Sequence, residues 1–190
     1  MMRKHFGMLL HNILAGSVRR WHTEVVNSEQ TVAEHTFGVL LVLLWVVPRE
    51  ELTQDLLLAA LEHDLGERSV GDVSARVKWL MTEEQRVQLE QAEAEARSNA
   101  GLPGPALTER EHLYLQFADY AEAALYAMVE RSRGNRHAEF WLARLRPKLS
   151  SMREQLNEQA KELYHAIYTA PADRQQDPVL YALKEAGLGE

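Results

Sequence analysis

The sequence predicts an all-α domain. Apolar residues recur at helical spacing along most of the chain, three Thr-x-x-Glu or Thr-x-x-Gln capping boxes mark helix starts, and no segment alternates convincingly as a strand. Of the 190 residues, 46% are hydrophobic and 26% are charged, as in folded globular proteins. We expect one domain over residues 1–190, with a core over about 3–133 and a C-terminal helical extension over 134–190.

In the first half, the expected elements are separated by clear start and stop signals. Residues 17–30 have no apolar period, and we expect an ordered loop there because Trp21 must be buried. The capping box at Thr31 opens a helix that ends before Pro48, and Thr53 caps the helix after it. In order, we expect a helix over about 3–15, a loop over 17–30, helices over 31–47 and 53–66, a loop over 67–73 and a short helix over 74–80.

In the second half, Thr82 and Thr108 open two further capping boxes. The first of these helices carries charge on most faces, which indicates a surface position. Pro147 predicts a bend or a restart within a later helix, and Asp177-Pro178 is a good start for a final one. In order, we expect helices over 82–99, 108–133, 137–168 and 177–186.

The composition excludes several functions. There is no cysteine, so the protein has no disulfide, no thiolate-bound zinc and no cysteine nucleophile. The net charge of −7 and the lack of a long basic run argue against a nucleic-acid polymer as partner. The longest apolar run, Val39 to Val47, is too short to span a membrane, and residues 1–11 do not resemble a signal peptide. We therefore expect a cytoplasmic protein that does not bind membranes.

Four residues on three expected helices have the side chains of a metal site. His63 and Asp64 follow the apolar run 56–61, and His35 and Asp119 lie upstream and downstream. Neutral imidazole and ionised carboxylate are common ligands of divalent cations, and this set suits Mn, Co, Fe, Ni or Zn better than Mg. A polar cap at a helix end would explain only His63 and Asp64. Because adjacent helical residues diverge by about 100°, the helix must end at this pair if both side chains bind one ion.

The same residues resemble the ligand signature of the HD-domain phosphohydrolases. The resemblance covers roughly residues 3–130 and is closest to the 5′-deoxynucleotidase branch and its phage relatives, which hydrolyse deoxynucleoside triphosphates such as dATP. It implies a compact multi-helix HD-domain fold with one divalent transition metal, and it allows a second, phosphate-bound Mg. We also expect a homo-oligomer. The motifs appear in that branch's order: Arg20-Trp21-His22-Thr23, Thr31 to His35, His63-Asp64-x-x-Glu67, Gly71-Asp72, Val77-Lys78 and Ala118-Asp119.

The resemblance also implies roles around the metal. Glu67 would orient or deprotonate the attacking water, and Asp72 would contact that water or the sugar 3′-hydroxyl. Arg20 and Lys78 are the natural phosphate cations, with Arg19 as a rival for the same task. Trp21 would wall off the deoxyribose and exclude a 2′-hydroxyl, or would simply pack in the core. His22 and Thr23 would line the base or sugar pocket.

We therefore expect a metal-dependent phosphohydrolase of 2′-deoxynucleotides that acts on a small molecule. The phage-like Arg-Trp-His-Thr motif favours a deoxynucleoside triphosphate (dATP-type) triphosphohydrolase that releases deoxynucleoside and triphosphate. The alternative is a 5′-deoxynucleotidase that acts on deoxynucleoside 5′-monophosphates. Two other classes remain: a di-iron bundle using Glu109-x-x-His112 and Glu162-x-x-His165, and a non-catalytic nucleotide-binding protein. The presence of Glu67 and Asp72 argues against the last.

Overall fold

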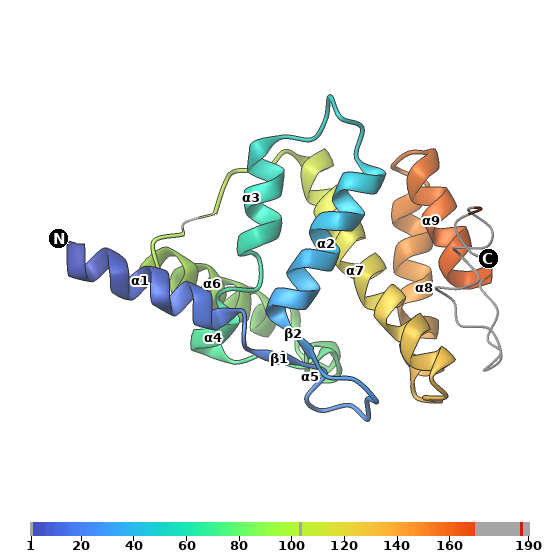
Figure 1. Cartoon of the computed structure of the whole chain (residues 1–190), viewed down its shortest axis with the longest axis horizontal. Helices are drawn as coiled ribbons and strands as arrows, with labels where there is room; N and C mark the ends of the chain where they lie inside the picture. The colour runs from blue at the N-terminus through green and yellow to red at the C-terminus, as the bar shows by residue number, and fades with distance from the viewer. Residues whose placement is uncertain (1, 103, 170–186, 188–190) are drawn as a thin grey trace.

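Helix α7 (Glu109–Ser132) runs through the centre of the molecule and packs against α2, α3, α8 and α9 (Figure 1). The computed structural model describes residues 2–102, 104–169 and 187. The all-α prediction is confirmed. The other helices are α1 (Met2–Ala15), α2 (Val32–Val46), α3 (Gln54–Glu62), α4 (Glu67–Val70), α5 (Ala75–Leu80), α6 (Glu83–Asn99), α8 (Ala138–Arg153) and α9 (Glu158–Thr169).

The core forms where α2, α3, α8 and α9 meet α7. Phe117 and the alanines on the same side of α7 are buried and allow close helix packing. Leu43 and Val46 of α2 and Leu56 of α3 complete this side of the core, and Trp141 and Leu149 of α8 and Ile167 of α9 complete the other. Helices α8 and α9 are therefore packed on the same core as the helices before them.

The helix starts agree with the sequence. Thr31, Thr82 and Thr108 each accept a hydrogen bond from the backbone N–H three residues on, and Glu or Gln at that position closes the capping box. Thr53 caps α3 in the same way through Leu56 N–H. The three predicted capping boxes are confirmed.

The loop before α2 contains two short strands that the sequence did not predict. Strand β1 (Arg19–Arg20) pairs antiparallel with β2 (Gln30–Thr31), and Arg20 lies opposite Gln30. Strands of two residues are too short to show an alternating pattern. The pairing fixes the two ends of the loop that holds Trp21.

Two helix boundaries also differ from the prediction. Residues 67–73 were expected to be a loop, but α4 occupies Glu67–Val70, and Gly71, with φ of 86°, ends it in the left-handed conformation. Helix α8 continues through Pro147, because buried residues on both sides hold it against the core. The restart comes instead at Asn157, whose Oδ1 accepts a hydrogen bond from Ala160 N–H at 3.0 Å. The expected helix over 177–186 lies outside the described residues.

Helices α1 and α6 lie at the edge of the structure (Figure 1). No residue of α6 is buried, as its charge pattern predicted. The backbone of α6 nevertheless comes so close to Gly66 that a Cβ there would lie 2.7 Å from the carbonyl oxygen of Glu93. Glycine is therefore required at the end of the turn that carries His63 and Asp64. None of the described helices combines the length and apolar content needed to cross a membrane.

Candidate functional site

His63 and Asp64 lie where α3 ends. The regular helix stops at Glu62, and a tight turn follows in which Leu65 N–H bonds to the carbonyl of Glu62 and Glu67 N–H to that of Asp64. The α6 side chain Arg97 donates to the carbonyl of His63 at 3.1 Å and braces this turn. Because the helix ends here, the two adjacent side chains can converge on one point.

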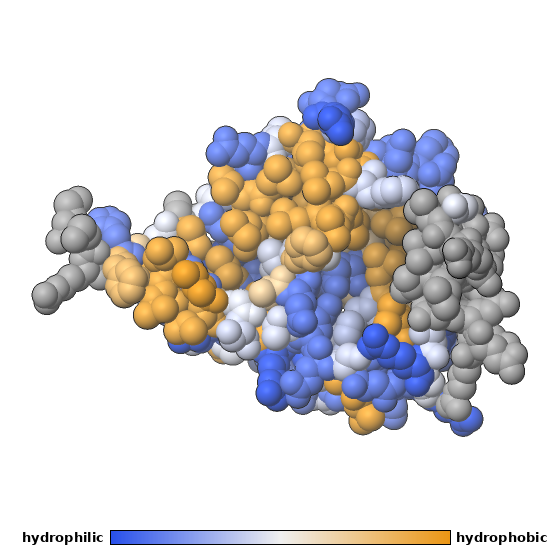
Figure 2. All heavy atoms as spheres, in the orientation of Figure 1, coloured by the Kyte–Doolittle hydropathy of each residue, from blue (hydrophilic) through white to orange (hydrophobic). Residues whose placement is uncertain are grey.

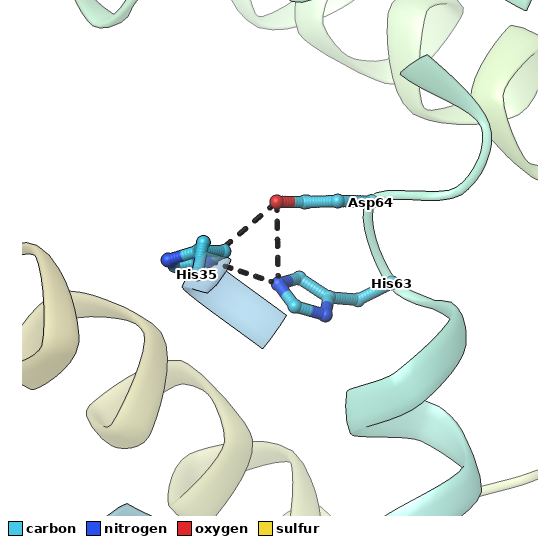
Figure 3. A group of neighbouring side chains, drawn as sticks. All are labelled: His35, His63 and Asp64. Carbon is cyan, nitrogen blue, oxygen red and sulfur yellow. Dashed lines mark hydrogen bonds and ion pairs between the residues drawn. The ribbon is translucent and has the colours of Figure 1, made fainter. Parts of the chain in front are cut away.

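The side chains of His35, His63 and Asp64 point toward a common centre (Figure 3). His35 Nε2 lies 3.3 Å from His63 Nε2 and 3.5 Å from Asp64 Oδ2. His63 Nε2 lies 3.4 Å from the same carboxylate oxygen. Ligand atoms bound about 2.1 Å from one ion lie roughly 3.0–3.4 Å from each other. The observed separations therefore fit a single transition-metal ion.

The outer nitrogens of both imidazoles also fit metal ligation. His63 Nδ1–H donates to the carbonyl of Ala60 at 2.7 Å, and His35 Nδ1–H donates to the carboxylate of Glu122. When both rings are neutral, these bonds leave Nε2 of each ring with a lone pair that faces the centre. Two facing lone pairs beside a carboxylate would repel one another, and a bound cation removes this repulsion.

Asp119 comes from the middle of α7 and meets this group through His35. Its Oδ1 lies 3.1 Å from His35 Nε2, while its side chain keeps 33% of its surface exposed. Glu122, one turn further along α7, contacts the opposite nitrogen of the same ring. The carboxylates of α7 therefore approach both nitrogens of His35.

The charges at the centre stabilise each other in the metal-free protein. Burial opposes the charge on His35, but its bonds to Asp119 and Glu122 outweigh burial and raise its pKa to about 9. Burial also opposes the charge on Asp119, yet the bond to His35 holds its pKa below the usual value. For Asp64, burial is outweighed by His63 and Arg20, so its pKa is lowered.

Glu67 lies in the first turn of α4 with 4% of its surface exposed. Burial, followed by the charges of Asp64 and Asp72, raises its pKa to about 8. Its Oε2 is buried and has no hydrogen-bond partner in the described part of the chain. A buried acid of this kind, beside a metal-binding cluster, is well suited to holding or moving a proton near neutral pH.

The side chains predicted to bind phosphate differ in their burial and in their ion-pair partners. Arg20 is half-buried and pairs with Asp64 through Nη1, while its buried Nε has no hydrogen-bond partner among the described residues. Lys78 lies 3.9 Å from Glu93. The rival Arg19 is exposed and pairs with Glu29 at 2.8 Å. It does not line the pocket described below.

Trp21 lies directly after Arg20 in an unusual backbone conformation. Its φ is 59°, a left-handed conformation that costs about 1–3 kcal/mol outside glycine. Its ring stacks on Tyr126, with centroids 5.1 Å apart, and lies 4.7 Å from Trp141. The next residue, His22, is exposed and contacts Asp72 at 3.1 Å.

One pocket joins most of the predicted residues. Its volume is about 670 Å³, and Arg20, Trp21, Thr23, Asp64, Glu67, Asp72, Lys78 and Asp119 line it. His22 does not line it. Other residues that line this pocket were missed by sequence reasoning. Their aromatic and cationic side chains are Trp79, Tyr120, Trp141, Arg76, Arg86, Arg144 and Lys148.

The most important missed residue is Glu122. The available signal was its spacing from Asp119, because residues three apart lie on the same helix face. Gln30 and Trp141 gave no such signal, since their positions depend on the strand pair and on the packing of α8. The di-iron alternative is wrong, because Glu109, His112, Glu162 and His165 are all exposed.

A protein-family model described as "5′-deoxynucleotidase YfbR-like" matches residues 5–165. A search of curated proteins finds no match. The matched range contains every residue of the centre and the pocket. It also extends beyond residue 130, where the sequence resemblance was expected to stop, and includes the α8 residues of the pocket wall.

Proposed function

The chain belongs to the YfbR-like 5′-deoxynucleotidase family of HD-domain phosphohydrolases, and we propose that it hydrolyses deoxynucleoside 5′-monophosphates to deoxynucleosides and inorganic phosphate. It is a metal-dependent enzyme of deoxynucleotide hydrolysis. The triphosphohydrolase activity that we expected first has less support, because the family fits the monophosphate alternative better. The family match, together with a centre that fits a divalent ion, is the observation that carries this proposal.

His35, His63, Asp64 and Asp119 are the proposed metal ligands. A divalent cation held by them would supply positive charge next to the phosphate oxygens of the substrate. Mn, Co, Fe, Ni and Zn suit this nitrogen and oxygen set. The ligand assignment is supported by the distances of 3.1 to 3.5 Å that separate His35 Nε2 and His63 Nε2 from each other and from the nearby carboxylate oxygens.

The residues around the centre are proposed to have separate roles in hydrolysis. Arg20 and Lys78 bind phosphate oxygens, and the unpartnered Nε of Arg20 supports this role. In its ionised form, Glu67 orients the attacking water and accepts its proton. As the new oxygen–phosphorus bond forms, the bond from phosphorus to the 5′-oxygen breaks, and that oxygen takes up a proton. We assign the supply of that proton to Glu67 as well, and its raised pKa supports this, since it lets Glu67 exchange protons near neutral pH.

Trp21 and Asp72 are proposed to recognise the sugar. Trp21 presents an apolar ring to the pocket directly after the phosphate-binding Arg20. A 2′-hydroxyl placed against it would lose hydrogen bonds to water without gaining others. Asp72 has its carboxylate in the same pocket and can accept a bond from the 3′-hydroxyl. Thr23 lines the pocket as a minor contact, and His22 acts through Asp72.

Product analysis tests the proposal directly. The protein is incubated separately with dAMP, AMP and dATP over Co²⁺, Mn²⁺, Zn²⁺ and Mg²⁺, and free phosphate and triphosphate are measured. We expect phosphate and deoxyadenosine from dAMP, little hydrolysis of AMP, and no activity in His63→Ala or Asp64→Ala. Triphosphate released from dATP at a higher kcat/KM than phosphate from dAMP would restore the triphosphohydrolase assignment.

We also propose that the protein is a homo-oligomer in which two copies associate through an apolar face. Figure 2 shows apolar surface over α1 and over α2 and α3. The exposed parts of its side chains amount to roughly 1,000 Å² per chain, compared with about 800 Å² per partner in a stable interface. The face consists of Phe6, Leu9, Leu10 and Ile13 of α1, Phe37, Leu41, Leu44 and Trp45 of α2, and Leu61 of α3.

A further inference from the structure

A chain of three hydrogen bonds connects the proposed sugar wall with the metal centre. Trp21 Nε1–H donates to Gln30 Oε1 at 2.9 Å, and Gln30 Nε2–H donates to Glu122 Oε1 at 2.7 Å. The second oxygen of Glu122 accepts from His35 Nδ1–H. Gln30 therefore lies between Trp21, which lines the pocket, and Glu122, which holds the metal-site residue His35.

The chemistry of the partners allows only one orientation of the Gln30 amide. The indole N–H can only donate, and an ionised carboxylate can only accept. Gln30 must therefore turn its oxygen to Trp21 and its nitrogen to Glu122. Through Glu122, this orientation of the amide also keeps a proton on Nδ1 of His35, so that Nε2 is the nitrogen that binds a metal once it is deprotonated.

Burial and close packing hold this series of hydrogen bonds in place. Gln30 is 6% exposed and Glu122 8% exposed, so neither can readily replace a lost bond with water. Gly38, one turn after His35 on α2, leaves the space in which Glu122 lies. A Cβ on Gly38 would sit 2.6 Å from Cγ of Glu122. At the other end, the left-handed backbone of Trp21 places its indole N–H against Gln30.

We propose that Gln30 is a positioning residue that couples Trp21 to His35, so that the sugar wall and the metal ligand keep a fixed mutual geometry. The proposal rests on the proposed function only in assigning sugar recognition to Trp21. Loss of a hydrogen bond at either end of this series changes the side-chain geometry at the other end. A substitution at Trp21 therefore alters metal binding, although Trp21 does not touch the metal ligands.

The first experiment measures binding of Mn²⁺ alone to the full-length protein, without substrate, by competition with a chelator. Trp21→Phe removes the indole donor but keeps an apolar ring, and Gln30→Met removes the amide with little change in volume. We expect each to weaken Mn²⁺ binding roughly 3- to 10-fold. Trp79→Phe, another tryptophan that lines the pocket, is the matched control and leaves the affinity unchanged. Unchanged affinity in both folded variants overturns the proposal.

The double variant Trp21→Phe/Gln30→Met tests the route of the coupling. If the effect of Trp21 passes through Gln30, the second substitution adds little to the loss caused by the first. Losses that multiply show two independent effects and also overturn the coupling. Thermal unfolding and circular dichroism confirm that each variant is folded at the temperature of the titration.

Gly38→Ala probes the same chain without touching its hydrogen-bonding groups. The added methyl displaces Glu122, so we expect Mn²⁺ affinity to fall by about 10- to 100-fold. The preference for dAMP over AMP falls in the same variant, because Gln30 loses its acceptor. A lower Tm with unchanged Mn²⁺ affinity would show a purely structural role and contradict the proposal. Failure of the parent to hydrolyse dAMP would refute the proposed function, while the Mn²⁺ titrations would still decide the coupling.

Discussion

His35 and Glu122 are separated by 87 residues in the sequence, yet the Nδ1–H of one bonds directly to the carboxylate of the other. The bond orients the imidazole and leaves its Nε2 free to bind a metal. Glu122→Ala should therefore lower the affinity for Mn²⁺ or Co²⁺ by about 10- to 100-fold, the usual effect of losing such a partner. Chelator competition measures it, with the exposed Glu109→Ala on the same helix as control. Equal affinity in both variants would contradict the orienting role.

Glu67→Gln should keep the metal and lose turnover. The amide fills the same buried space but cannot accept a proton, so we expect kcat to fall by about 10²- to 10⁴-fold with KM little changed. Elemental analysis gives the metal content and steady-state kinetics the rate. Glu84→Gln, at an exposed position on α6, serves as control. Loss of the metal together with activity would instead make Glu67 a ligand.

Trp21→Ala should reduce the preference for deoxynucleotides. Removing the ring opens space for a 2′-hydroxyl, and one excluded hydroxyl corresponds to about 1–3 kcal/mol of discrimination. The measurement is kcat/KM for dAMP and AMP in parent and variant. Trp79→Ala, at another part of the same pocket, should leave the ratio intact. A parent that hydrolyses both sugars equally well would remove the role assigned to Trp21.

The stability of the metal-free protein should fall as pH rises from about 6.5 to 9. The folded-state pKa of His35 is raised from 6.5 to about 9, so its stabilising charge is fully present below 6.5 and lost through 9. The pKa of Glu67 is raised from 4.5 to about 8, so its ionisation also destabilises the fold as pH rises. Tm in a chelator at several pH values measures this trend. In Glu67→Gln the dependence should be weaker.

Metal binding should show the opposite pH dependence. The ligands bind in their deprotonated forms, so a proton on His35 competes with the ion below pH 9. Affinity for Mn²⁺ should therefore rise with pH across the range in which the metal-free protein loses stability. The gain in Tm on adding Mn²⁺ should grow correspondingly. A gain that shrinks with pH would contradict the assignment of His35 as a ligand.

Charge placed on the apolar face should separate the proposed oligomer. Leu44→Glu on α2 and Ile13→Glu on α1 each bury a charge in the interface, and we expect the mass by light scattering to fall to that of one chain, 21.7 kDa. Val87→Glu, at an exposed position on α6, is the control. A parent that elutes as a monomer would exclude this interface.

The sequence by itself predicted the all-α fold and most helix starts, and it indicated a candidate metal site. Capping residues act within one turn, so Thr31, Thr82 and Thr108 predicted their helix starts from local chemistry alone. Imidazole and carboxylate side chains at His35, His63 and Asp64 similarly indicated a metal site before their distances were known. The family of the enzyme could also be predicted, because its motifs are short and ordered along the chain.

Only the tertiary structure decided how these residues support one another. The contact of Glu122 with His35 depends on the packing of α7 against α2 and on the space above Gly38. The place of Trp21 depends on a strand pair too short to show a pattern and on Trp141, which the packing of α8 supplies. These contacts join segments far apart in the chain, and their geometry is set by close packing of the whole core rather than by any local sequence signal.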